Sequence, residues 1–127
     1  MSKIDQLLDR ASEKFTASEI LANHEHFDDA ISRTFYGLLF CARAILLTKN
    51  VSSEDPDEII SAFNSEFVKK GVIDKELGKL LKDVKKLAEK ADFSPSFGTS
   101  DEKIRGLMES AELFMEQVED AISELEE

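Results

Sequence analysis

Residues 27–47 form the longest apolar stretch of the chain and restrict its possible folds more than any other segment. The stretch reads FDDAISRTFYGLLFCARAILL, and small or apolar side chains cover most of its helical circumference. A helix on the surface of a globular protein shows one apolar stripe and one polar face. A helix that is apolar nearly all round must be covered on several sides, by its own chain or by a second subunit. We therefore predict the central helix of a bundle, partly exposed in the protomer and covered by a partner.

The expected subunit contact lies on this helix and is entirely apolar. Asp28, Asp29, Arg33 and Arg43 interrupt the stretch, and charged side chains are costly inside a bilayer. We therefore expect a homodimer and no membrane contact. The residues expected at the interface are Phe35, Leu38, Leu39, Ala42 and Ile45.

The composition predicts one helical domain over residues 1–127. The chain is 42% hydrophobic and 34% charged, with five glycines and two prolines, which is typical of an all-helical protein. Cys41 is the only cysteine, so no intrachain disulfide can form, and a buried thiol in a reducing compartment is expected. The charged N-terminus lacks the continuous apolar core of a signal peptide. These features predict a cytoplasmic location.

Hydrophobic periodicity predicts five helices and no sheet. Four main helices and one short accessory helix, joined by short connections, imply an all-α, antiparallel up-down four-helix bundle. Residues 93–100 contain proline, glycine and four Ser/Thr residues and are expected to be a loop. The predicted helices cover residues 2–23, 27–48, 56–70, 74–92 and 100–125.

Charge is distributed unevenly along the chain. The net charge of −11 argues against DNA and against generic binding to nucleic-acid backbones. Residues 69–90 are nevertheless rich in lysine, whereas the last helix is acidic. The two helices are expected to pair their charges, and the alternative is a basic edge that faces a polyanion.

The end of the fourth predicted helix is the strongest ligand candidate in the residue pattern. Its cations complement the helix dipole, which is a sufficient structural explanation. The functional alternative is a phosphate or base site, in which Lys86 or Lys90 contacts phosphate and Phe93 or Phe97 stacks on a base.

His24 and His26, followed by Asp28 and Asp29, are the obvious candidates for metal ligands. Histidines two residues apart on a helix point to different faces, although a helix break at residue 24 would let both converge. We expect a solvated helix junction, with no metal and no cofactor.

Four segments, in order over about residues 17–122, resemble the small prokaryotic HEPN proteins. The matching positions are Ala30-x-x-Arg33-x-Phe35-Tyr36-Gly37 with Ala42-x-Ala44-Ile45-Leu46, then Phe63-x-x-x-Phe67-Val68-Lys69-x-Gly71, then Ala91-Asp92-Phe93, and finally Ala111-x-x-Phe114. The resemblance implies a bundle of four or five helices that is usually dimeric and is often encoded with a small nucleotidyltransferase. Many such proteins are metal-independent ribonucleases, and many of those are toxins.

The family's ribonuclease mechanism depends on an Arg-x(4–6)-His pair, and no arginine of this chain is followed by histidine at that spacing. Ala88 stands where the subfamily has the arginine of R-x-x-A-D-Y, no histidine lies near Pro56, and Phe35 and Phe93 replace tyrosines. We therefore predict no catalytic residues. The ligand or RNA candidates are Arg33, Tyr36, Lys86, Lys90, Asp92 and Phe93.

Three functions follow from these observations. The first is a non-catalytic HEPN module that dimerises and binds a partner protein, such as a nucleotidyltransferase, or a nucleotide or RNA, as in toxin-antitoxin systems. The second is a metal-independent ribonuclease toxin that uses replacement residues. The third is a small helical adaptor unrelated to nucleic acid.

Overall fold

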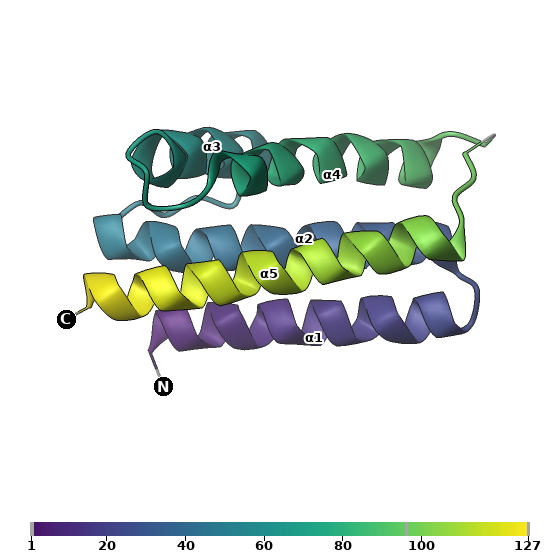
Figure 1. Cartoon of the computed structure of the whole chain (residues 1–127), viewed down its shortest axis with the longest axis horizontal. Coiled ribbons are helices and arrows are strands. Elements are labelled where there is room, and N and C mark those ends of the chain that lie inside the picture. The colour runs from purple at the N-terminus through teal and green to yellow at the C-terminus, as the bar shows by residue number, and fades with distance from the viewer. Residues whose placement is uncertain (1, 96, 127) are drawn as a thin grey trace.

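The computed structural model describes residues 2–95 and 97–126, which form an all-helical bundle (Figure 1). No strand occurs within these ranges. The part of the expected 93–100 loop that falls on Ser96 lies outside the described residues. The elements are α1 (Lys3–Asn23), α2 (Phe27–Leu46), the 3-10 turn η1 (Leu47–Lys49), α3 (Pro56–Phe63), the π-helical segment η2 (Asn64–Val68), α4 (Lys75–Phe93) and α5 (Asp101–Leu125).

The predicted up-down architecture is confirmed. The helices α1, α2, α4 and α5 lie side by side and alternate in direction, and the short α3 lies across one end of the bundle (Figure 1). Both α4 and α5 pack on α2, but within the described chain they hardly contact each other. Helix α2 is therefore the common centre of the fold.

The prediction of a subunit interface on α2 is wrong for the five residues named for it. Phe35 and Leu39 are only 6% exposed, and Leu38, Ala42 and Ile45 are completely buried in the single chain. The physical reason is that α1, α3, α4 and α5 all pack against α2 and cover the apolar circumference. This helix is the core of one protomer, and these side chains are not free to contact a second copy.

Helices α1 and α2 approach closely because their contact contains small and hydroxyl side chains. A Cβ atom at Gly37 would lie 2.4 Å from the Phe15 ring, so glycine provides the space that this ring occupies. Ser18 and Thr34 are completely buried, and their hydroxyl oxygens lie 2.6 Å apart. Each hydroxyl also lies within hydrogen-bond distance of the Ala30 carbonyl oxygen, to which at least one of them donates. These hydrogen bonds satisfy polar groups that would otherwise destabilise the core.

The third predicted helix divides into two parts. Regular α-helix ends at Phe63, and residues 64–68 continue as π-helix, closed by a hydrogen bond from the Lys69 amide to the Asn64 carbonyl. The predicted stop at Gly71 is confirmed, since its φ is +78°. The left-handed residue at the α1–α2 junction is Glu25, with φ of 64°.

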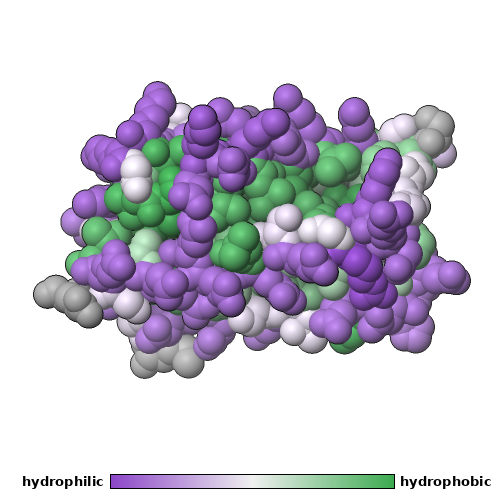
Figure 2. All heavy atoms as spheres, in the orientation of Figure 1, coloured by the Kyte–Doolittle hydropathy of each residue, from purple (hydrophilic) through white to green (hydrophobic). Residues whose placement is uncertain are grey.

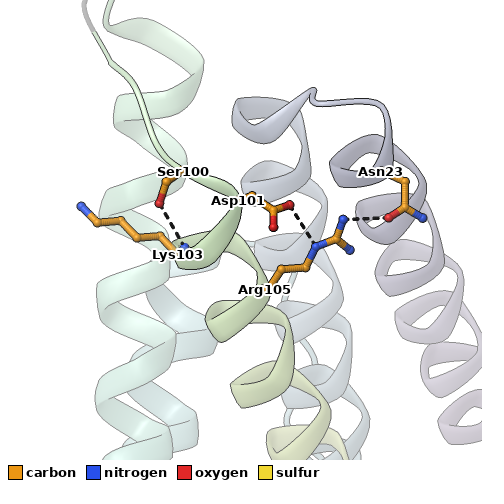
Figure 3. Close-up of polar contacts among 5 residues, drawn as sticks. All are labelled: Asn23, Ser100, Asp101, Lys103 and Arg105. Carbon is orange, nitrogen blue, oxygen red and sulfur yellow. Dashed lines mark hydrogen bonds and ion pairs between the residues drawn. The ribbon is translucent and has the colours of Figure 1, made fainter.

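The N-terminal turn of α5 is stabilised by hydrogen bonds within the helix and by a hydrogen bond to α1 (Figure 3). The Ser100 hydroxyl accepts a hydrogen bond from the Lys103 amide and so caps the start of the helix. Arg105 donates to Asp101 within the same helix and, over 2.7 Å, to the side-chain oxygen of Asn23 at the end of α1. This bridge holds α5 against the end of the α1–α2 hairpin.

One segment, Phe27–Lys49, is long and apolar enough to cross a membrane by length and composition alone. Within it, 72% of the most apolar window is buried inside the molecule, as in the core helix of a soluble protein. The segment is therefore only weak evidence for a membrane span.

Cys41 is expected to be unreactive in the native protein. Its side chain is completely buried, and desolvation, followed by the negative charge of Glu119, raises the pKa of the thiol. Because only the thiolate reacts, we expect iodoacetamide at pH 8 to alkylate Cys41 about 100-fold more slowly in the folded chain than in urea. Mass spectrometry of timed samples measures this ratio, and equal rates in both states would contradict the burial.

Candidate functional site

One face of α2 is left uncovered by its neighbours. Residues spaced alternately four and three apart form a line along the helix, and none of them is fully buried. Tyr36, at its centre, is 41% exposed. We call this line the open stripe, and it consists of Asp29, Arg33, Tyr36, Phe40 and Arg43.

Guanidinium groups stack on the aromatic rings of the open stripe. The Arg33 guanidinium carbon lies 5.5 Å from the centre of the Tyr36 ring. The Phe40 ring contacts two such groups, Arg43 from α2 at 5.3 Å and Arg10 from α1 at 5.6 Å. Each contact is within the distance of a cation–π interaction. Three of the four arginines of an acidic chain therefore gather on one face.

The structure shows which groups surround the Arg33 side chain. An ion pair with Asp28, Asp29 or Glu112 would give Arg33 a purely structural role. Across residues 2–95 and 97–126, no carboxylate lies within ion-pair distance of Arg33, and its only recorded side-chain partner is the Tyr36 ring. Arg33 is half-buried, and its guanidinium group has N–H donors that the contact with the Tyr36 ring does not use.

Asp92 is joined to α2 by a hydrogen bond that the sequence did not reveal. The hydroxyl of Ser32, which is 4% exposed, donates to a carboxylate oxygen of Asp92 in the last turn of α4. Ser32 precedes Arg33 and lies one turn before Tyr36, so three of the six predicted ligand residues belong to one region. Ser32 is identified only by its contact in the structure, because serine is a common residue and nothing in the sequence distinguishes this one.

Of the remaining three predicted ligand residues, two lie on one turn at the end of α4 and the third lies elsewhere. Phe93 is 84% exposed at the end of α4, and Lys90 is exposed on the same turn. Lys86 instead lines a groove between the α3–η2 segment and α4. The predicted phosphate-and-base site at the end of α4 is therefore not assembled as one pocket.

The groove that contains Lys86 has a volume of about 440 Å³, and we call it the basic groove. Lysines from two elements face it, with serines, an asparagine and one acid between them. Its lining residues are Asp57, Ile60, Ser61, Asn64, Ser65, Lys69, Lys82, Lys85 and Lys86.

Lys85 is the one groove lysine with recorded ion pairs. Its ammonium lies 2.7 Å from Glu89 and 3.0 Å from Asp57, and hydrogen bonds to these two carboxylates raise its pKa. The expectation that the basic helix pairs its charges with the acidic last helix is wrong for the described residues. The recorded ion pairs of α4 join it to α3 and to itself.

A second groove, of about 360 Å³, lies between α4 and α5 and is mostly apolar. Ile31, Leu87, Ile104 and Leu107 contribute to its lining. Figure 2 shows the apolar surface between these two helices, on the face that Figure 1 presents. The surface is exposed because α4 and α5 both pack on α2 and leave a gap between them.

The two histidines lie at the α1–α2 junction and are exposed, as the sequence predicted. His26 lines a shallow depression with Glu25, Asp28 and Asp29. No group of three or more potential metal-ligating side chains occurs in the part of the chain that the structure describes.

The position of His26 relative to the open stripe bears on the ribonuclease alternative. Ribose 2′-hydroxyl activation requires a base beside the phosphate-binding cation. His26 is seven residues before Arg33, about two helical turns away, and is held in the junction. The open stripe therefore supplies cations and aromatic surface, and Arg33 lies about two helical turns from the His26 imidazole.

Comparison with known proteins shows the same family that the sequence motifs resemble. A HEPN domain model matches residues 4–121. A Methanocaldococcus jannaschii protein named as a candidate toxin is 29% identical over 123 residues, which cover 97% of this chain and 91% of that protein. A second candidate toxin from the same organism is 27% identical over 113 residues, covering 89% and 77%. A UPF0332 protein of Thermotoga maritima is 30% identical over 116 residues, covering 91% and 88%.

Proposed function

Because this chain belongs to the HEPN family, we propose that it is a non-catalytic HEPN module that acts by association in a toxin-antitoxin-like system of the cytoplasm. It forms a homodimer through the open stripe, and the dimer binds a partner protein, for which a nucleotidyltransferase is the first candidate, or a nucleotide or RNA. No membrane or DNA contact is part of the proposal.

The observation that carries this proposal is the set of stacked arginines and aromatics on the open stripe. Arginine and aromatic side chains are enriched at protein interfaces and dominate their binding energy. Arg33 lies one turn from Tyr36 and stacks on its ring, so the pair is already ordered before a partner arrives. Pre-ordered side chains lose less conformational entropy on binding, which favours association.

Placing a negative charge on the open stripe tests the proposal. We expect the wild-type chain to be a dimer at 50 µM by light scattering, and Arg33→Glu and Tyr36→Glu to be folded monomers. An interface residue of this kind contributes about 2 kcal/mol or more, which corresponds to a weakening of the dimer by roughly 30-fold or more.

Leu113→Glu is the matched control, because Leu113 is 50% exposed on α5 and lies outside the open stripe. This variant should remain dimeric. A monomeric wild type would contradict the proposed dimer, and a dimer that only Leu113→Glu disrupts would place the contact on α5 instead.

The ribonuclease alternative makes a different prediction. RNA cleavage that survives metal chelation and is lost in Lys86→Ala would favour it over a non-catalytic module. The adaptor alternative is favoured if neither nucleotide nor RNA raises the melting temperature, since a ligand selective for the native state stabilises it.

A further inference from the structure

Helix α4 and the π-helical segment approach each other closely beside the basic groove. A Cβ atom at Gly78 would lie 2.4 Å from the side-chain oxygen of Asn64 and 2.8 Å from a Val68 methyl group. Glycine therefore permits the two elements to meet at one end of the groove. Asn64 donates to the Ile60 carbonyl, which fixes its amide in the groove wall. π-helical turns within helices are frequent at functional sites.

The charge of the groove is opposite to that of the whole molecule. Four lysines face it in a chain of net charge −11. Lys85 is neutralised by Asp57 and Glu89. Lys69, Lys82 and Lys86 have no recorded carboxylate partner in the described chain, so three ammonium groups from two separate elements remain available to an anion.

The chemistry and size of the groove together limit the ligand. The ammonium groups, the serine hydroxyls and a side-chain amide are hydrogen-bond donors, and phosphate oxygens are hydrogen-bond acceptors. A volume of about 440 Å³ falls within the range of small-molecule sites. Asp57 and Glu89 border the lysines, so a strand of nucleic acid that continued past the groove would meet carboxylates.

We infer that the basic groove is a binding site for a compact, multiply charged phosphate, of the size of inorganic tripolyphosphate or the triphosphate of a nucleotide. The site shares no residue with the open stripe. Its occupancy is therefore separable from dimerisation, and either proposal can fail while the other holds.

Isothermal titration of the full chain with sodium tripolyphosphate tests this inference. We expect saturable binding of one anion per chain, weakened about tenfold or more in the double variant Lys82→Gln/Lys86→Gln, because two charge-assisted contacts are lost. Lys82→Arg/Lys86→Arg keeps the charge and should retain binding. The matched control is Lys75→Gln/Lys79→Gln, which removes the same charge from exposed positions of α4 outside the groove and should change the affinity less than about twofold.

Two further ligands separate the possible sources of the phosphate. Equal affinities for tripolyphosphate and ATP mean that the phosphates alone are recognised, and tighter binding of ATP means that the nucleoside also contacts the groove. Absence of saturable binding at millimolar tripolyphosphate would overturn the inference. Equal losses of affinity in the groove and control variants would also overturn it. Single-stranded RNA that binds more tightly than tripolyphosphate, with an affinity that grows with RNA length, would do the same.

Discussion

Leu38→Glu is expected to leave the chain unfolded. Leu38 is completely buried among the helices that pack around α2. An isolated carboxylate in such a site costs several kcal/mol, in addition to the lost apolar packing. Domains of this size are stable by only about 5–15 kcal/mol, so this single change removes most or all of the margin.

Circular dichroism at 222 nm and a urea titration measure this loss. Tyr36→Glu, which introduces the same carboxylate two residues earlier, is the matched control and should keep its helix content because Tyr36 is 41% exposed. A Leu38→Glu chain that is folded and monomeric would show instead that Leu38 belongs to a subunit contact, as the sequence alone had indicated.

The misassigned interface shows what hydrophobic periodicity can and cannot determine. The pattern of residues 27–47 identifies a helix that must be covered on several sides, and this is correct. The pattern does not say how many neighbours the chain itself supplies, because the packing directions of α1, α3, α4 and α5 depend on connections whose geometry is not encoded in periodicity. Phe35 and Ile45 are therefore core residues that the sequence could equally assign to a dimer.

The sequence predicts local features, such as helix ends, better than it predicts contacts between distant segments. Pro56, Gly71 and Ser100 mark helix ends, and the structure places helix ends at or beside all three because their roles depend on backbone conformation and local hydrogen bonds. The π-helical turn at residues 64–68 was not predicted, because π-helix is rare and a single turn of five residues is too short to show a period of its own.

The same distinction between local and long-range features applies to the two candidate sites. Arg33 and Tyr36 are one turn apart, so the sequence could place them together. The basic groove needs Lys69 beside Lys82 and Lys86, and this proximity depends on the packing of η2 against α4 at Gly78. The run of lysines in residues 69–90 was the available signal, but it did not show which of them share a face.

Phe114→Ala is expected to lower the stability of the chain by about 3–5 kcal/mol, the cost of removing a completely buried aromatic ring. The Phe114 ring on α5 stacks on Phe63 at the end of α3, with 5.3 Å between ring centres and 27° between planes. Phe63 in turn contacts Phe67 in the π-helical segment, at 6.0 Å. This chain of rings connects α5 to the α3–η2 segment, so the substitution loosens the contact between them and opens a cavity.

Thermal unfolding checks the size of this effect. With an unfolding entropy of about 2.1 cal/mol/K per residue, 3–5 kcal/mol corresponds to a fall in melting temperature of about 10–20 °C. Phe114→Leu keeps most of the volume and should cost less than about 2 kcal/mol. Phe63→Ala removes the other side of the same stacked pair, so the double variant should lose less stability than the sum of the two single losses. Strict additivity would mean that the two rings do not stabilise each other, and that α3 is held to the bundle by its contacts with α2 and α4 alone.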